Sequence, residues 1–582
     1  MNNYDFYIKD RDRYLNKIIN SDAPRKLIIA GPGTGKTYTF RKLLEKSLKS
    51  SNKKGLVITF IKNLVKDLDR DLKDLADVRT FHSFCRSQIT KIKRPHFEYY
   101  PNLLRIIEKD LSILDPSFKK EKTKLDSYFF ELKEKKIEKA IKIGDYYNAV
   151  GHTDSVYRVF KYYELHPEAI PEYPIVLVDE YQDFNLLETK LIEKLALKNP
   201  ILIVGDDDQA LYNFKNSSPN FLRNLVKDDR YEKFSLPYCQ RCTKVIVDAV
   251  NKIIEVAKRS GRLNGRIDKP FKYFAPDKSL DSIENPRIIY VHCSVENKNC
   301  HYAGKYICNE ILNMPRSYVN EAEHRNEPAV LIIGPRHFLD GVKKELSARN
   351  LPIEERKKER ENGYNILDAY KILLRNPESK LGWRIIMEFE ANLNIENIIR
   401  NSISKNESLF KYLKAYNDFY KSNLILLDIL KKVKSNKDLN QNEERLLMSR
   451  IRTPLDKIKS FIMDQNIEDA DDRIESDKES KGPRILFTSF EGSKGLAAQY
   501  VFIVGLNKGH CPKNDPPDDR DIFKFIVALT RGRKRAYIIS YGNYAGNFLQ
   551  RSIFINYIKA FLSDEVLVDK LYMRTICRET RK

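Results

Sequence analysis

The chain has 582 residues, of which 42% are hydrophobic and 32% charged, a composition typical of a folded globular protein rather than a disordered one. The 104 lysines and arginines outnumber 81 acidic residues, and the net charge of +23 favours a polyanionic partner, although a lysine-rich surface alone would produce the same excess. No apolar run approaches the ~18–20 residues of a membrane helix, and the charged start MNNYDFYIKDRDRYL does not resemble a secretory signal, so we expect a cytoplasmic protein without membrane partners.

Short apolar runs recur along the chain and predict buried strands. Runs of this length without alternation suit parallel sheets that helices cover on both faces, and helical patterns at 36–49, 187–198 and 243–258 lie between them. We therefore predict an α/β fold with two parallel-sheet domains. The runs are LIIA (27–30), GLVITF (55–60), IVLVDE (175–180), ILIVGD (201–206), RIIYVHC (287–293), AVLIIGP (329–335), RILFTSF (484–490), YVFIVG (500–505) and RAYIISY (535–541).

Two long helical stretches interrupt this pattern, and the second ends in an acidic segment, NIEDADDRIESDKESKGP, that is typical of a flexible linker. We expect each α/β domain to carry one of these stretches as an insertion. The first domain is predicted to consist of residues 1–84 and 166–232, with 85–165 as its helical insertion. The second is predicted to consist of residues 233–375 and 483–582, with 376–482 as its insertion and linker.

The segment AGPGTGKT follows a predicted strand and precedes a predicted helix, which is the context that a phosphate-binding loop requires. Its glycines let backbone N–H groups point at phosphates, and the N-terminus of the next helix favours negative charge. Lys36 is expected to reach the β- and γ-phosphates, and the Thr37 hydroxyl is expected to bind Mg²⁺. The predicted nucleotide-binding residues of this loop are Ala30, Gly31, Pro32, Gly33, Thr34, Gly35, Lys36 and Thr37.

A second acidic motif, DEYQD (179–183), stands at the end of a later buried strand. A carboxylate there completes the Mg²⁺ shell of a phosphate-loop enzyme, so Asp179 is a predicted metal ligand and Glu180 is placed to polarise the attacking water. The alternative is an acidic helix cap after a core strand, which suits Asp183 better than the first two residues. The two motifs predict an NTPase without indicating what it acts on.

In chain order, the motifs resemble those of the UvrD/Rep-type superfamily 1 DNA helicases over nearly the whole sequence. The resemblance implies two RecA-like domains, 1A and 2A, with helical insertions 1B and 2B. It implies a Mg²⁺- and ATP-dependent translocase or 3′→5′ helicase that acts on single-stranded DNA and tailed duplex DNA. The matching segments are AGPGTGKT (motif I), VITF (Ia), TFHS (80–83), DEYQD (II), GDDDQALY (205–212, III), LPYCQRCT (236–243, IV), SKGL (493–496, V) and LTRGRKR (529–535, VI).

The resemblance also assigns roles to residues outside the phosphate loop. Arg241 and Arg531, both from the second domain, would neutralise the γ-phosphate, an effect worth ~10³–10⁵ in rate in related NTPases. Gln209 resembles the family's γ-phosphate sensor, and Lys494 is expected to face the nucleotide. The two cysteines that flank Arg241 form a lone CxxC, which we interpret as packed thiols rather than a metal site. The predicted catalytic residues are Lys36, Asp179, Glu180, Gln209, Arg241 and Arg531.

Single-strand binding in such proteins combines aromatic stacking with positive charge, both indifferent to sequence. The family's stacking positions match Phe60, Tyr212 and Phe214, with His82 nearby, and Lys215 stands where the family usually has arginine. The alternative for each aromatic is an ordinary core position. Stacking grooves accept either sugar, so the residues alone leave RNA open, and the resemblance favours DNA.

Several positions depart from the family pattern. No glutamine precedes Gln88, although the family recognises adenine with an early glutamine, and Ala497 replaces the glutamate that holds the ribose. Glu491 replaces a usual histidine. We therefore expect a complete phosphate end of the site but relaxed base and ribose recognition. The alternative function is a DNA-sensing regulatory ATPase with little unwinding of its own, acting within a larger complex such as an anti-phage system with a nuclease partner.

Overall fold

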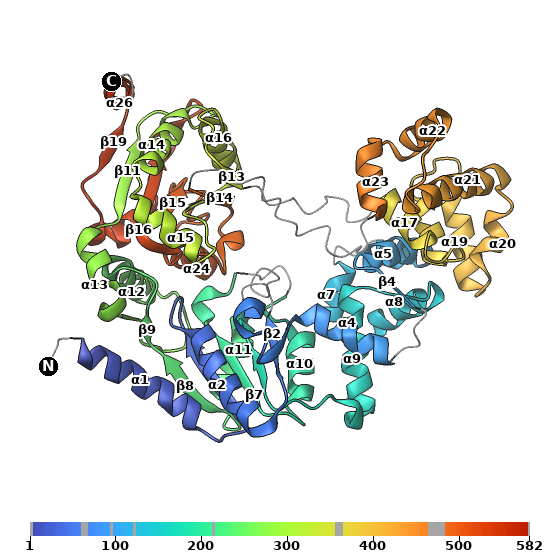
Figure 1. Cartoon of the computed structure of the whole chain (residues 1–582), viewed down its shortest axis with the longest axis horizontal. Coiled ribbons are helices and arrows are strands. Elements are labelled where there is room, and N and C mark those ends of the chain that lie inside the picture. Colours follow the sequence, from blue (N-terminus) through green and yellow to red (C-terminus); the bar gives the residue numbers. More distant parts are fainter. Residues whose placement is uncertain are drawn as a thin grey trace.

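The computed structural model describes residues 4–59, 68–92, 97–119, 124–211, 216–354, 365–463 and 483–579, with side chains described as far as residue 574. Two α/β units lie on one side of the molecule, and two groups of helices lie on the other (Figure 1). Within these ranges, no helix combines the length and the apolar character that crossing a membrane would need.

The first α/β unit is a six-stranded sheet in the order β3-β2-β6-β7-β1-β8, and all its paired strands are parallel. Its inner strands are buried almost throughout, as expected for a sheet with helices on both faces. The elements are α1 (Asp5–Asn20), β1 (Arg25–Ala30), α2 (Lys36–Ser51), β2 (Gly55–Thr59), β3 (Ala76–Thr80), β6 (Val176–Val178), α10 (Leu186–Leu195), β7 (Ile201–Gly205), α11 (Pro219–Val226) and β8 (Glu232–Leu236).

The second α/β unit is a seven-stranded parallel sheet in the order β13-β14-β12-β15-β16-β11-β19. Small strands β9 (Tyr238–Cys239) and β10 (Lys272–Tyr273), and the hairpin of β17 (Asn543–Tyr544) and β18 (Asn547–Phe548), accompany it. The other elements are α12 (Lys244–Arg259), α13 (Ala275–Glu284), β11 (Ile289–Cys293), α14 (His301–Leu312), α15 (Arg316–His324), β12 (Val330–Ile333), α16 (Arg336–Ser347), β13 (Ile353–Glu354), β14 (Ile485–Thr488), β15 (Ala498–Val504), α24 (Asp519–Leu529), β16 (Gly532–Tyr541), α25 (Ile553–Tyr557), β19 (Val566–Val568) and α26 (Lys570–Glu579).

The two parallel sheets confirm the predicted α/β class, and each predicted apolar run contains a strand. The strands outside those runs include β3 and β8 at the edges of the first sheet, and β13 and β19 at the edges of the second. Edge strands are covered on fewer sides, so their sequences need no continuous apolar run; β8, for example, is mostly exposed or half-buried. The sequence pattern therefore identified the sheet interiors better than their borders.

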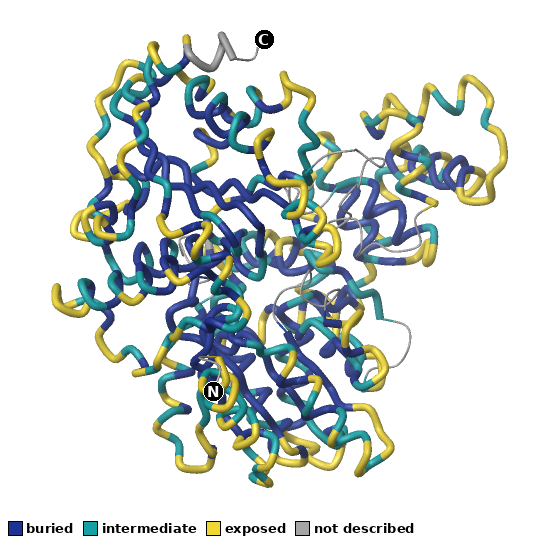
Figure 2. The backbone as a smooth tube through the Cα atoms, turned by 60° about the vertical axis from the view of Figure 1, so that its left-hand side comes forward, coloured by how far each residue is buried: buried dark blue, intermediate teal, exposed yellow. Residues whose placement is uncertain are grey.

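The first group of helices begins within the TFHS segment and includes two short paired strands. Its main helices pack around a common apolar centre. Figure 2 shows that buried backbone lies in the interior of the molecule and exposed backbone mainly at its periphery. The elements are α4 (Phe81–Ile92), β4 (Glu98–Tyr99), α5 (Leu103–Leu114), α6 (Pro116–Lys119), α7 (Leu125–Phe130), α8 (Glu134–Tyr146), β5 (Ala149–Val150) and α9 (His152–Leu165).

The second group of helices packs directly on the first, α19 against α5, and the two share one hydrophobic cluster (Figure 1). This group already includes α17, ahead of the predicted start at residue 376, and the predicted limit at 232 falls at the first residue of β8. The domain limits remain our proposal. The elements are α17 (Ile366–Leu373), α18 (Lys380–Met387), α19 (Ile395–Ser404), α20 (Leu409–Leu413), α21 (Asn417–Lys434), α22 (Gln441–Ile451) and α23 (Leu455–Met463).

A fully buried ion pair also joins the two helical groups. Arg384 of α18 donates to Asp110 of α5 through Nη2, at 2.6 Å, and through Nε, at 2.9 Å, and neither side chain is exposed. The Tyr147 hydroxyl donates to the other oxygen of Asp110 at 2.6 Å. Two insertions that are far apart in the sequence thus form one packed body, a contact that the sequence did not predict.

Candidate nucleotide-binding site

The phosphate loop connects β1 to α2 at the carboxyl edge of the first sheet. Gly33 and Gly35 have φ values of 70° and 86°, in the left-handed region that glycine adopts at little cost. A Cβ atom at Gly33 would also lie 2.5 Å from the Cβ of Arg241, so this position has no room for a side chain. The loop therefore requires glycine for both its backbone conformation and its close contact with the second unit.

Lys36, the first residue of α2, lies among carboxylates. Its Nζ is 2.8 Å from Glu180 Oε1 and 3.6 Å from Asp179 Oδ1, and both acids follow β6 directly. Glu180 has a φ of 55°, an uncommon backbone conformation that costs free energy and tends to occur at functional sites. Gln182 Nε2 donates to the other carboxylate oxygen of Glu180 at 2.6 Å and so fixes its orientation.

The charges in this cluster shift the pKa values of its members. Burial by itself would lower the pKa of Lys36, but the charges of Asp179 and Glu180 raise it above its ordinary value. Burial acts to raise the pKa of Glu180, yet Lys36 and Lys494 hold it below its ordinary value. Burial raises the pKa of Asp179, against the opposing charge of Lys36. Glu180 is therefore an anion at neutral pH and can accept a hydrogen bond from water.

The second α/β unit contributes two cations to the same place. Lys494, after the short helix η6 (Glu491–Ser493), donates to the Asp183 carboxylate and, at 2.6 Å, to the backbone oxygen of Gln209. Arg531, two residues after the end of α24, donates to Gln209 Oε1 at 3.4 Å. Lys494 and Asp183 are 311 positions apart in the chain, and Arg531 and Gln209 are 322 positions apart. Burial and the charge of Arg241 lower the pKa of Arg531 below its ordinary value. The structure thus brings the predicted residues of the two units together.

The helix-cap interpretation of Asp183 is wrong. Asn185 caps α10 instead, since its side chain accepts from the backbone N–H of Glu188 and the Glu188 carboxylate accepts from that of Asn185. The spacing of these two residues is a capping box, a pattern that could have been recognised in the sequence. Asp183 pairs with Lys494, and burial raises the pKa of its carboxyl to about 6 against the opposing charge of that lysine.

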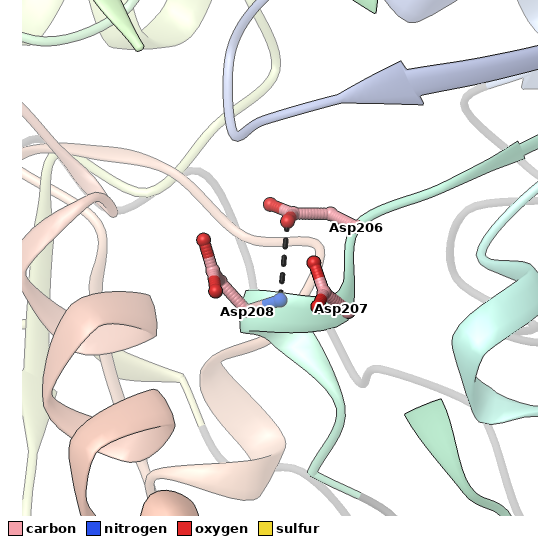
Figure 3. Close-up of side chains that lie close together, drawn as sticks. All are labelled: Asp206, Asp207 and Asp208. Atoms are coloured by element: carbon pink, nitrogen blue, oxygen red, sulfur yellow. Dashed lines mark hydrogen bonds between the residues drawn. The ribbon is translucent and has the colours of Figure 1, made fainter. Parts of the chain in front are cut away.

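Gln209 lies in η3 (Asp207–Gln209), next to three consecutive aspartates at the end of β7. Its Nε2 donates to Asp206 Oδ2 at 2.7 Å, so a residue of the first unit holds the side chain that Arg531 contacts from the second. Figure 3 shows that the carboxylates of Asp206, Asp207 and Asp208 gather in one place, with Asp206 accepting from the backbone N–H of Asp208 at 3.1 Å. Their ligand atoms are close enough to suit a metal ion.

Three cations meet these carboxylates, however. Lys269 Nζ is 2.7 Å from Asp206 and 3.0 Å from Asp208, and it also contacts Asp207. Arg266 donates to Asp208 at 2.8 Å and Arg223 to Asp207 at 3.1 Å. Sequence reasoning missed these three residues. The available signal was the aspartate run itself, because three buried carboxylates after a core strand require positive partners.

The remaining predicted residues divide between described and undescribed parts of the chain. Arg241 contacts the phosphate loop through its Cβ at Gly33, and the backbone N–H of Gln240 donates to Gly33 O at 2.9 Å. His82 lies at the start of α4 with its ring 5.0 Å from that of His152. Among the departures from the family pattern, Glu491 pairs with Lys524 and Arg520. Phe60, Tyr212, Phe214 and Lys215 lie outside the described residues.

The fold and this site define the chain as a phosphate-loop protein in which two α/β units meet at the nucleotide-binding loop. Residues 16–215 match the family described as "AAA domain". A probable DNA helicase II homolog of Mycoplasma capricolum is 24% identical and covers 90% of this chain and 83% of its own. That of Mycoplasma genitalium is 22% identical over 91% and 85%.

A third relative matches a smaller part of the chain. The ATP-dependent DNA helicase PcrA of Staphylococcus aureus is 26% identical over 39% of this chain and 38% of its own. With the Mycoplasma matches covering most of the sequence, these similarities support a UvrD/Rep-like superfamily 1 helicase.

Proposed function

We propose that this protein is a DNA helicase that couples ATP hydrolysis to 3′→5′ movement on single-stranded DNA. The names of its relatives support an ATP-dependent DNA helicase at the level of the family. The observation that carries the proposal further is the position of Gln209, which Asp206 holds from the first unit while Arg531 and Lys494 contact it from the second. A change at the nucleotide can therefore reach both units through one residue.

The donor groups near the phosphate loop fit a nucleotide with Mg²⁺. The Asp179 carboxylate and Thr37 hydroxyl are hard oxygen ligands of the kind that Mg²⁺ prefers, and they would hold an ion that neutralises phosphate charge. Lys36 has carboxylates as its present partners, and we propose that its charge moves to the phosphates when ATP binds. Glu180, kept anionic by its neighbours, then orients the attacking water and accepts its proton.

Movement along DNA would follow because the groups that contact the phosphates are divided between two units. Arg241, Lys494 and Arg531 approach from the second unit, so ATP that binds all of them draws the units together, and loss of the γ-phosphate releases them. For the DNA path we propose His82 together with Phe60, Tyr212, Phe214 and Lys215. Stacking and charge at such positions would grip a single strand without regard to its sequence.

The proposal is tested with the purified full-length chain. We expect ATP hydrolysis that single-stranded DNA stimulates at least tenfold, and displacement of a strand from a duplex with a 3′ tail but not a 5′ tail. Lys36→Ala is the matched control and should abolish both activities, because it removes the phosphate-binding cation. Hydrolysis that ignores DNA, or unwinding from the 5′ tail, would contradict the proposal.

The alternative, a regulatory ATPase within a larger complex, has less support. The relatives that match over most of the chain are named as helicases without a nuclease. A relative named as part of an ATP-dependent helicase/nuclease, from Natranaerobius thermophilus, matches only 41% of this chain and 18% of its own. Unwinding by the isolated chain would remove this alternative, whereas activity only after a nuclease partner is added would favour it.

A further inference from the structure

Two cysteines flank Arg241, Cys239 at the end of β9 and Cys242 in the turn before α12. Cys239 and Cys242 are both fully buried and both free thiols. Cys239 Sγ accepts from the backbone N–H of Cys242 at 3.5 Å and lies 3.3 Å from where a Cβ of Gly33 would be. Cys242 Sγ donates to the backbone oxygen of Thr530, the residue before Arg531, also at 3.5 Å. One thiol thus contacts the phosphate loop and the other the segment that carries Arg531.

We propose that Cys239 and Cys242 are an oxidation site, and that a disulfide between them switches off nucleotide hydrolysis by displacing Arg241. The spacing of two intervening residues is the one that reversible redox pairs use. The two thiols also touch the phosphate loop on one side and the Thr530–Arg531 segment on the other. Closing the bond draws the Cys242 sulfur from the Thr530 carbonyl toward Cys239, so the turn that carries Arg241 changes shape.

The surroundings give the two thiols different reactivities. Burial acts to raise the pKa of Cys239, but hydrogen bonds from Cys242 and the charge of Arg241 lower it to about 6. The hydrogen bond with Cys239, together with burial, raises the pKa of Cys242 well above its ordinary value. At neutral pH, Cys239 is thus the attacking thiolate and Cys242 is the protonated thiol that resolves the intermediate.

A hydroperoxide supplies the oxidising equivalents. The Cys239 thiolate attacks one peroxide oxygen, the O–O bond breaks, and Cys239 becomes a sulfenic acid while the other oxygen leaves as water after taking a proton. The Cys242 sulfur then attacks the sulfenic sulfur, loses its proton, and expels a second water. Two thiols and one hydrogen peroxide thus become one disulfide and two waters, and a dithiol reductant reverses the change.

Both sulfurs are buried, Cys239 against Gly33 of the first unit and Cys242 against Thr530 within the second, so access to Cys239 depends on the separation of the two α/β units. A nucleotide that holds the units together should therefore protect Cys239 from alkylation and oxidation. The expected loss of activity is large, since a catalytic group displaced by ~1 Å can cost about 100-fold in rate. The loss of activity on oxidation rests on the proposed function, because it requires that the protein hydrolyses ATP. Formation of the Cys239–Cys242 disulfide does not depend on that function.

The experiment treats the reduced full-length protein with hydrogen peroxide, traps free thiols with N-ethylmaleimide, and identifies the Cys239–Cys242 linkage by peptide mass. We expect the disulfide to form, ATP hydrolysis to fall 10- to 100-fold, and dithiothreitol to restore it. Cys242→Ser should no longer show the loss of hydrolysis that dithiothreitol reverses. The activity of this variant after peroxide treatment is compared only with its own activity before treatment. Cys308→Ser, a buried cysteine of another cluster, should keep the full response.

The outcomes separate this proposal from that of the helicase function. Absence of the Cys239–Cys242 linkage at a peroxide dose that oxidises other thiols overturns the oxidation site, as does a quantitative disulfide that leaves hydrolysis unchanged. Absence of hydrolysis in the reduced protein counts against the proposed function alone. In that case, the affinity for a fluorescent ATP analogue, measured before and after oxidation, serves as the second readout.

Discussion

Replacing Arg384 by methionine should loosen the contact between the two helical groups, because it leaves Asp110 buried without its cation. Arg384 makes two hydrogen bonds to Asp110 and a third, at 2.7 Å, to Glu388. Removing one member of a buried pair costs about 3–5 kcal/mol, since the other charge then lacks a partner. Burial raises the pKa of Asp110, and the charge of Arg384 opposes that rise. Without Arg384, the Asp110 carboxyl takes up a proton more readily and loses its charge. The expected free-energy cost of the substitution is therefore about 3 kcal/mol, the lower end of that range.

Hydrogen exchange measures this change through the backbone amides of α5 and α18. With a cost of about 3 kcal/mol, amides that exchange when the groups separate should do so about 100-fold faster. Arg375→Met is the matched control, because Arg375 pairs with Glu98 across the same contact at 3.2 Å but is 43% exposed. The exposed Arg375–Glu98 pair contributes at most about 1 kcal/mol, so its loss should speed amide exchange by about fivefold at most.

The two variants decide whether the reasoning holds. Equal exchange rates in Arg384→Met and Arg375→Met would refute the claim that the buried pair holds the helical groups together. A further variant tests the cause. Combining Asp110→Leu with Arg384→Met removes both charges, and it should recover much of the protection that the single change loses, because no unpaired charge remains buried.

Three further predictions concern the nucleotide site. Glu180→Gln should keep ATP and DNA bound, as read by filter binding, but lower hydrolysis ~10²–10⁴-fold; near-normal turnover would exclude it as the base. Lys269→Met should lower kcat more than it changes KM, because Asp206, which holds the Gln209 side chain, loses the cation that it pairs with. Lys272→Met, at a half-exposed residue, should have no effect. Hydrolysis should decline as pH falls through about 6, where Asp183 gains a proton and loses its charge toward Lys494. Asp183→Asn should be less active and lack that decline, and an unchanged acid limb would assign it to another group.

Local sequence was enough to predict the phosphate loop and the acidic motif that follows β6. The glycines, Lys36 and Thr37 are contiguous, and their geometry depends on one strand, one turn and the first turn of a helix. Buried strands were equally predictable, because a strand covered on both faces has to be apolar throughout. Edge strands such as β8 escaped prediction for the complementary reason, since solvent tolerates their polar side chains.

The sequence by itself thus predicted the α/β class, which the two parallel sheets confirm, and a resemblance that the relatives support. The residues at the phosphate end of the site were also predicted from it, and their roles remain our proposal. Only the tertiary structure decided how distant segments meet: Lys494 with Asp183, Arg531 with Gln209, and Arg384 with Asp110. These pairs join residues that are more than 270 positions apart, and a polar residue carries no local signal of its partner. Each pairing depends on which elements the folded core places side by side, because a buried charge is stable only where packing supplies the opposite one.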